Sequence, residues 1–522
     1  MTSFWFRFAL LVAFPLSGFA APVKIWVELR DKGPLSISGI AGENVPVYVP
    51  YLQQLKAAGF TLDIALKWQN RVSGWIDSEK VGGLNRLSIV RSVEGMPRKA
   101  PYIRMASNPS RNVLSKMELT PIFGVFQPVF DTTEASALRV AITTAGQTAG
   151  QGMRVSIIDA DFDLGNQAFN HLKQNGLIAD QWDFVSNKPV IVKDSLSSSH
   201  GAATLSLLGG QSSDFEGMVP NAKFLLYRAE NVATETYVEE DYVAAAIERA
   251  VDSGAKVISI SLGYRYDYTD TSQKDLPYSS LNGRTRPSSL AALGAARRNV
   301  LVSVSMGNDG GRVSTTPTIS APADADSILS VGILDINLKP CSYTSTGPTY
   351  DHRVKPEVST VGTNSCATPT VDATVANGYK YQAGTSFAAP VIAGIATLLR
   401  QLHPTASAQS IRQALIVTAA KYAHPDSAAG NGLVRSLDAH NVLNSISDIA
   451  LNGPYGPEKG MFPWYRNRER FNAPWKPGLD PSAARLWDLQ GRSIPVHAGA
   501  AIPVLWIDPG NQAAGIYVWK IP

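Results

Sequence analysis

The sequence predicts an α/β protein built on a mostly parallel β-sheet with helices on both faces, preceded by a small α+β unit and followed by a small all-β module. From about residue 150, short β-rich apolar runs alternate with longer stretches of helical spacing, which is the pattern of strands joined by crossover helices. The 522 residues, 44% hydrophobic and 17% charged, are enough for one large domain and smaller ones.

Charge and cysteine content argue against two kinds of site. The formal net charge of +4 comes from 47 basic and 43 acidic residues, without the long basic block that tracks phosphates, so we expect no nucleic-acid partner. The only two cysteines, Cys341 and Cys366, lack the number and the histidine neighbours of a zinc site. A cysteine-based metal cluster is therefore excluded.

Residues 1–20 have the pattern of a cleaved signal peptide. Arg7 precedes an apolar run at 8–14, and Gly18-Phe19-Ala20 supplies small residues for cleavage. A short membrane anchor is the alternative, but the apolar run is too short for it. In an exported protein the two cysteines can form one disulfide, with two buried free thiols as the alternative.

Residues 21–115 are expected to fold as a compact α+β unit. Strand-like or helical spacing occurs in four runs: Lys24–Leu29, Tyr48–Ala58, Thr61–Ile76 and Leu87–Val93. Prolines interrupt the periodicity between about 97 and 135, which indicates a linker and a candidate processing region. We assign 116–149 to this linker and the start of the mature region.

The large domain is assigned to residues 150–448. Five short runs predict strands: Val155–Ile158, Phe224–Tyr227, Val257–Ser261, Val300–Val304 and Ile328–Ile333. The stretches Tyr242–Ser253 and Ser288–Arg298 predict helices between them. Chemistry gathers at the carboxyl ends of such strands, where this sequence has Asp159, Ser261-Leu262-Gly263 and Gly307-Asn308.

A serine lies at the start of a predicted buried helix. Its surroundings are Gly384-Thr385-Ser386-Phe387-Ala388-Ala389-Pro390, followed by the apolar run 391–399. The helix is apolar on all sides and, at about 15 residues, too short to cross a bilayer, so it belongs inside a domain. Free amides and the helix dipole at Ser386 favour a developing negative charge, as a nucleophile requires. The alternative is an ordinary serine cap on a core helix.

One histidine among seven is of special interest. His200 opens a helix of small residues, His200–Gly210, although an ordinary surface histidine would also fit. With it the chain presents Asp159, His200, Asn308 and Ser386 in that order, each beside small residues that permit close approach.

This order, and the strings that carry it, resemble the subtilisin-like serine proteases over residues 150–445. Ile157-Ile158-Asp159, His200-Gly201, Gly307-Asn308 and the Ser386 string correspond to the family's Asp, His, oxyanion and nucleophile motifs. Tyr227-Arg228-Ala229-Glu230, Glu235 and Glu239 resemble a branch found in Bacteroidetes-type bacteria. Two departures are Ala160-Asp161 after the Asp, and Gly201-Ala202-Ala203 after His200.

The resemblance implies an exported serine endopeptidase that hydrolyses protein or peptide substrates through an acyl-enzyme. Asp159, His200 and Ser386 would form the triad, Asn308 would bind the oxyanion, and Ser261, Leu262 and Gly263 would align the substrate. It also implies a self-processed zymogen whose own propeptide acts as inhibitor. No cofactor is required; structural calcium is common in the family, but no metal ligands can be assigned.

Three further expectations concern the neighbourhood of these residues. Asp161 either raises the pKa of a nearby carboxyl by like-charge proximity or occupies a turn conformation suited to glycine. Ser303, Val304, Ser305 and Met306 would surround the primary pocket and contain no acid, so a strict Arg/Lys preference is not indicated. We expect a Cys341–Cys366 bridge.

Two other functions compete with the peptidase. A protein of the same fold that has lost activity could serve as a surface binding module. An esterase of the α/β-hydrolase type is disfavoured, because Ser386 lies in Gly-Thr-Ser-Phe-Ala rather than Gly-x-Ser-x-Gly.

The C-terminal end has a different composition. Residues 449–478 form a linker rich in proline and aromatic residues, and 479–522 form a small β-rich module. The strings Leu489-Gln490-Gly491-Arg492 and Gly515-Ile516-Tyr517-Val518-Trp519-Lys520 resemble the sorting domains of type IX secretion substrates. This resemblance implies a secreted or cell-surface protein that passes the periplasm of a Gram-negative bacterium and meets its secretion machinery. A carbohydrate- or partner-binding module is the alternative.

Overall fold

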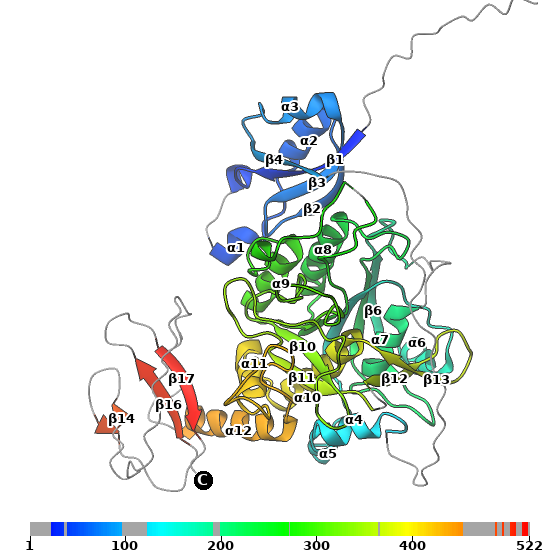
Figure 1. Ribbon diagram of the computed structural model, residues 1–522, viewed down its shortest axis with the longest axis vertical. Helices are drawn as coiled ribbons and strands as arrows, with labels where there is room; N and C mark the ends of the chain where they lie inside the picture. The colour runs from blue at the N-terminus through cyan, green and yellow to red at the C-terminus, as the bar shows by residue number, and fades with distance from the viewer. Residues whose placement is uncertain are drawn as a thin grey trace, which may run out of the picture.

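The computed structural model describes residues 22–35, 39–96, 123–191, 199–270, 272–363 and 366–452, together with four short C-terminal strands (Figure 1). The predicted signal peptide at 1–20 lies outside the described residues, as do the proline-rich segment 97–122 and residues 453–485.

Residues 22–96 form a four-stranded antiparallel sheet in the order β2-β3-β1-β4. Its strands are β1 (Pro22–Leu29), β2 (Thr61–Leu66), β3 (Arg71–Asp77) and β4 (Val90–Met96), and its helices are α1 (Gly39–Glu43), α2 (Val49–Ala57) and α3 (Val81–Leu84). The alternation expected over Thr61–Ile76 is thus two strands, which are separated at Asn70 by a left-handed backbone with φ 49°. This unit has an apolar core of its own, to which Ile25, Val27 and Leu29 contribute.

The central sheet has seven parallel strands in the order β11-β10-β9-β8-β5-β7-β6. They are β5 (Arg154–Asp159), β6 (Ile178–Asp183), β7 (Lys223–Arg228), β8 (Val257–Ile260), β9 (Leu301–Ser305), β10 (Leu329–Leu334) and β11 (Val358–Val361). The parallel sheet confirms the predicted fold class. The two edge strands were not anticipated, because β6 is largely polar and β11 has only four residues.

Helices cover both faces of this sheet, each above a separate apolar core. Those of the domain are α4 (Gln127–Thr132), α5 (Ala135–Thr144), α6 (Asn170–Gln174), α7 (His200–Gly209), α8 (Val238–Asp252), α9 (Pro287–Arg297), α10 (Ala388–Leu402), α11 (Ala408–Val417) and α12 (Ser436–Asn452). On one face lie α8 and α9, next to the N-terminal unit, and on the other α5, α7 and α10 (Figure 1). A hairpin of β12 (Ala367–Val371) and β13 (Tyr379–Ala383) leads into α10.

The described part of the stretch 116–149, which we assign to the linker and the start of the mature region, contains α4 and α5. Both helices pack on the main core through buried residues such as Phe130, Leu138 and Ile142. A proline at the start of α4 suits the first helical turn, where a missing N–H costs little, so Pro128 does not break the structure.

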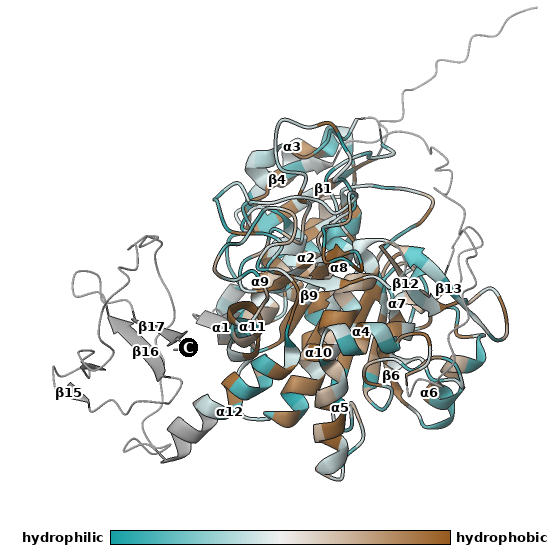
Figure 2. Cartoon of the chain, turned by 60° about the horizontal axis from the view of Figure 1, so that its bottom comes forward, coloured by the Kyte–Doolittle hydropathy of each residue, from teal (hydrophilic) through white to brown (hydrophobic). Residues whose placement is uncertain are grey.

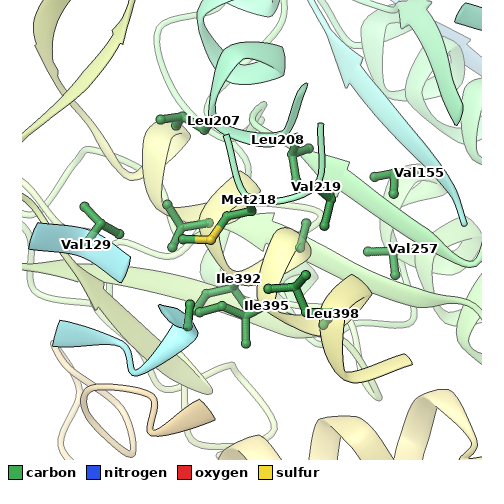
Figure 3. Close-up of a cluster of buried hydrophobic side chains, with 14 of the residues drawn as sticks. Val129, Val155, Leu207, Leu208, Met218, Val219, Val257, Ile392, Ile395 and Leu398 are labelled. Carbon is green, nitrogen blue, oxygen red and sulfur yellow. The ribbon is translucent and has the colours of Figure 1, made fainter. Parts of the chain in front are cut away.

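The helix α10 is the centre of the main core (Figures 2 and 3). Ile392, Ile395 and Leu398 lie near Met218 and Leu208 in this cluster. Gly394 permits the close approach, because a Cβ at this position would lie 2.3 Å from Met218 Cβ. The stretch Thr385–Leu402 has the length and apolarity of a membrane span, but 89% of it is buried inside the protein, as expected of a core helix.

The described part of the C-terminal module consists of two strand pairs. β14 (Leu486–Trp487) pairs with β15 (Ser493–Ile494), and β16 (Ile502–Ile507) pairs with β17 (Ala514–Trp519), both antiparallel. The turn Leu489–Arg492 and Lys520, on which the sorting resemblance depends in part, lie outside the described residues.

Candidate active site

Adjacent strands of the central sheet bring the predicted polar residues together. Asp159 ends β5, Ser261 follows β8, and Asn308 follows β9, and these strands are neighbours in the order β9-β8-β5. Because parallel strands end at the same edge of a sheet, these residues lie side by side. His200 begins α7, and Ser386 lies in the short 3₁₀ helix η5 (Thr385–Phe387) that leads into α10.

Asp159 and His200 form a tight pair. Asp159 is fully buried, and its Oδ1 lies 2.6 Å from His200 Nδ1 and accepts from the Ala160 N–H at 2.7 Å. Thr204 Oγ1, one turn into α7, donates to the other carboxylate oxygen at 2.9 Å. These bonds leave Asp159 with one orientation, which directs His200 Nε2 away from the carboxylate.

Glycine after the histidine is required by the packing. A Cβ at Gly201 would lie 2.4 Å from the carbonyl oxygen of Asp161 and 3.1 Å from Asp159 Cβ. Only glycine therefore allows α7 to start against the end of β5.

His200 is a stronger base than an ordinary histidine. Burial by itself lowers the pKa of His200, but the charge and hydrogen bond of Asp159, together with the charges of Glu230 and Asp161, raise this pKa to about 9. The site thus stabilises an imidazolium.

The carboxylate of Asp161 is buried and acts on His200 by raising its pKa. The turn conformation suited to glycine that was expected as one possibility is not observed, since Asp161 has no positive φ. The negative charge of Asp161 therefore helps to stabilise the protonated form of His200.

Ser386 is 9% exposed at the start of the apolar helix. Its Oγ donates to the carbonyl oxygen of Ser261 at 3.4 Å, while Ser261 Oγ donates to the Ser386 carbonyl at 2.7 Å. No Ser386–His200 hydrogen bond occurs among those of the described residues. In substrate-free enzymes such bonds are often long and tighten when substrate binds. The rings of His200 and Phe387, the next residue, lie 5.5 Å apart.

The side chain of Asn308 is oriented by the residue before the serine. Its Oδ1 accepts from the Thr385 N–H at 2.9 Å and from Thr385 Oγ1 at 3.0 Å. The Nδ2 group is thereby directed away from Thr385 and remains available to donate. The Asn308 amide and the Ser386 turn are therefore held as one unit.

The segment after β8 lies at the carboxyl edge of the sheet, and the four residues expected around the primary pocket, Ser303 to Met306, are buried. Ser261 and Leu262 are buried, and Gly263 is exposed beside them. Val304 and Met306 belong to the core under α8 and α9, and Ser303 donates to the α10 carbonyl of Ala389 at 2.8 Å. Alternate residues of a strand covered on both faces point into packed layers, so these three cannot line an open pocket.

Cys341 and Cys366 are joined by a disulfide. Among the described residues no group of three or more His, Cys, Asp or Glu side chains could hold a metal ion.

Comparison with known families matches the sequence pattern of the "Subtilase family" to residues 150–432, more than half of the chain. The chain belongs to the subtilase family. This subtilase is 27% identical over 296 residues to a thermophilic serine proteinase of Bacillus sp. (strain AK1), a match that covers 57% of the chain and 62% of that protein. It is 28% identical over 297 residues to thermitase of Thermoactinomyces vulgaris, covering 56% and 91%.

A solved structure extends the similarity beyond the family match. The epidermin leader peptide processing serine protease of Staphylococcus aureus superposes with a TM-score of 0.56 at 16% identity, covering 81% of this subtilase and 99% of that chain. At this identity only the fold is comparable. The match covers 62% of the Bacillus proteinase and 37% of a subtilisin-like protease of Arabidopsis thaliana, which is less than two thirds of the length of either relative.

Two residues that shape the site were missed in the sequence. Thr204 orients Asp159, and Thr385 orients Asn308. Thr204 lies one helical turn after His200, and a polar residue at that spacing in a helix of mostly small and apolar residues is a usable signal. Thr385 was part of a quoted motif, but its partner Asn308 is 77 residues away, so the contact could not be inferred.

Proposed function

We propose that this subtilase is an exported serine endopeptidase that acts through Asp159, His200 and Ser386. The observation that carries the proposal is the Asp159–His200 pair at the carboxyl edge of the sheet, with Ser386 and the Asn308 amide held next to it by Ser261 and Thr385. A carboxylate–imidazole pair beside a serine at a helix start suits acyl transfer.

In the proposed reaction, Ser386 Oγ attacks the carbonyl carbon of a peptide bond while His200 Nε2 takes its proton. Asp159 holds the Nδ1 proton and stabilises the imidazolium, which then protonates the leaving amine. Asn308 Nδ2 and the Ser386 N–H donate to the oxyanion. Water, deprotonated by His200, hydrolyses the acyl-enzyme. The extended Ser261–Gly263 segment aligns the substrate backbone.

The N-terminal unit is proposed to be a propeptide that inhibits the enzyme and is removed by self-cleavage in the segment between Met96 and Phe123. Its loop between β2 and β3 lies on α8, where Glu248 accepts from the Lys67 and Trp68 N–H groups at 3.0 Å each. Trp26 Nε1 donates to Asp241 at 2.5 Å. The N-terminal unit has a core of its own, but Ile64 and Leu66 of its strand β2 also belong to the core under α8, so apolar as well as polar contacts join it to the enzyme. A unit with its own core can fold with the enzyme and later leave it.

We test the proposal by labelling with a fluorophosphonate, which forms an adduct only on an activated serine. We expect labelling of Ser386 in the processed protein and no labelling in Ser386→Ala. The alanine variant, made in a protease-deficient host, is expected to keep its N-terminal unit. No adduct on Ser386 would instead favour the second candidate, an inactive surface binding protein; processing of Ser386→Ala like the native chain would refute self-cleavage.

Secretion is proposed to depend on the C-terminal module, with the type IX machinery as partner. The strings quoted above support it, and the described strand pairs fit a small β module. Deleting residues 479–522 is expected to leave peptidase activity intact while the enzyme remains in the periplasm. Normal appearance of the truncated protein outside the cell would contradict a sorting role.

A further inference from the structure

The segment Cys341–Ser345 lies between the two loops that carry the oxyanion donors. On one side it holds the loop that contains Asn308. The Ser345 N–H donates to the Gly307 carbonyl at 2.9 Å, and the Asp309 N–H donates to Ser345 Oγ at 2.9 Å. The Gly310 N–H donates to the Tyr343 carbonyl, also at 2.9 Å.

On the other side the same segment contacts the turn that carries Ser386. Tyr343 Oη accepts from the Gly384 N–H at 3.1 Å and donates to the Cys366 carbonyl at 2.5 Å. Both bonds use the hydroxyl's capacity as one donor and one acceptor. Removal from water raises the pKa of Tyr343 to about 12, so the hydroxyl keeps its proton over the working range.

The Tyr343 hydroxyl lies at the open end of the β12–β13 hairpin, where the two strands separate. Ala367 pairs with Ala383, so the next pair of an antiparallel ladder would be Cys366 and Gly384. The Tyr343 hydroxyl instead bridges the Cys366 carbonyl and the Gly384 N–H. The ladder ends there, and the chain turns at Gly384, with φ 143°, into Thr385 and Ser386.

The disulfide fixes the segment from its other end. Cys341, two residues before Tyr343, is bonded to Cys366, whose carbonyl accepts the tyrosine hydroxyl. The Tyr343 ring also lines a hollow of about 390 Å³ beside Asn308 and Arg312. Tyr343 is thus tied by its backbone to the Asn308 loop and by its hydroxyl to the serine turn.

We propose that Tyr343 is a positioning residue for the oxyanion site: it sets the distance between the Asn308 amide and the Ser386 turn. This rests on the proposed peptidase function. Loss of the hydroxyl leaves the Gly384 N–H without this partner and frees the turn to shift, and displacements of less than 1 Å are enough to slow an enzyme.

The test compares Tyr343→Phe with the native enzyme on a chromogenic peptide anilide. We expect kcat to fall about 10-fold with KM unchanged, because the hydroxyl acts on the transition-state site and not on substrate binding. Titrating active sites with the fluorophosphonate normalises kcat to folded enzyme, so a partly misfolded variant cannot mimic the effect. Tyr350→Phe, which alters a tyrosine 50% exposed to solvent, is the matched control and should leave kcat unchanged.

A second comparison separates positioning from general support of the fold. In an Asn308→Leu background the same Tyr343→Phe change should lower kcat by less than about threefold, because the effects of residues that act as one unit are not additive. An unchanged kcat in Tyr343→Phe, or the same loss in both backgrounds, would overturn the proposal. Absence of a titratable Ser386 in the native enzyme would instead refute the peptidase function.

Discussion

The helices α8 and α10 cover opposite faces of one sheet and have 15 residues each, but they are buried by different chemistry. Nearly every buried residue of α10 is apolar or small. In contrast, α8 buries four carboxylates, on Glu239, Glu240, Asp241 and Glu248.

The two helices bury different side chains because they pack against different parts of the molecule. The surroundings of α10 are the domain's own core, and its start follows directly on the turn with Ser386, so its packing can be permanent and apolar. The outer side of α8 contacts the N-terminal unit, whose backbone amides donate to Glu248 and whose Trp26 donates to Asp241, while Glu240 pairs with Arg286 of the enzyme domain itself. Ile64 and Leu66 of β2 also pack into the core under α8, so this contact is partly apolar. Its carboxylates can be hydrated again once the partner leaves.

The largest expected effect is a cavity under α10. Ile395→Ala removes a fully buried side chain from the main core, which should lower the free energy of unfolding by about 2–5 kcal/mol. Denaturant unfolding of the Ser386→Ala protein measures the loss without self-digestion. The control Val140→Ala, at a side chain 65% exposed, should change stability by less than about 0.5 kcal/mol. Equal losses at the two sites would contradict the assignment of α10 to the core.

The next effect concerns the chemistry at the start of α10. Asn308→Leu removes the proposed oxyanion donor and should reduce transition-state stabilisation by about 2.7–4 kcal/mol, seen in kcat with the fold and KM retained. Steady-state kinetics on a peptide anilide measures it. Unchanged turnover would remove Asn308 from the mechanism.

A smaller effect is expected where α8 meets the N-terminal unit. Burial raises the pKa of Glu248 to about 7, against the hydrogen bonds from Trp68 and Lys67 that lower it. Because the pKa of Glu248 is higher when the N-terminal unit is bound, this unit binds most strongly while Glu248 is protonated. Its binding weakens as pH rises through about 7. The difference between pH 5 and pH 7.5 is at most about 3 kcal/mol.

This pH dependence can be measured by holding the cleaved complex at pH 5 or pH 7.5 and quantifying the N-terminal fragment that stays bound on size-exclusion chromatography. Glu248→Gln should weaken binding at pH 5, because one backbone N–H loses its acceptor, and reduce the difference between the two pH values. Glu79→Gln, on the exposed surface of the same unit, is the control. Tighter binding of the fragment at pH 7.5 than at pH 5 would contradict the predicted direction of the pH dependence.

The smallest effect should come from Asp161. Its charge helps to raise the pKa of His200 to about 9, so the catalytic base is mostly protonated near neutrality and kcat/KM should rise with pH up to about 9. Asp161→Asn should move this rise to lower pH and increase kcat/KM at pH 7 by about twofold. A pH profile of kcat/KM tests it; a shift to higher pH would contradict the electrostatic role of Asp161.

The sequence by itself determined the class of sheet, the order of the four chemical residues and the buried helix at Ser386. Each of these is a local pattern: strand–helix alternation, polar residues directly after strands, and an apolar run without a polar face. The same local character explains the errors. Polar β6 gives no strand pattern, and the sequence pattern does not show the helices α4 and α5 in the stretch 116–149.

Only the tertiary structure decided how the site is held. Thr385 meets Asn308 across 77 residues, and Tyr343 meets Gly384 across 41. The burial of carboxylates on α8 became clear only in the structure, since the helix sequence alone indicates a solvated face: the N-terminal unit bonds to Asp241 and Glu248, and the enzyme domain bonds to Glu239 and Glu240. Hydrogen bonds between distant segments depend on how sheet order and turns place the backbone, and a local pattern carries no record of the partner.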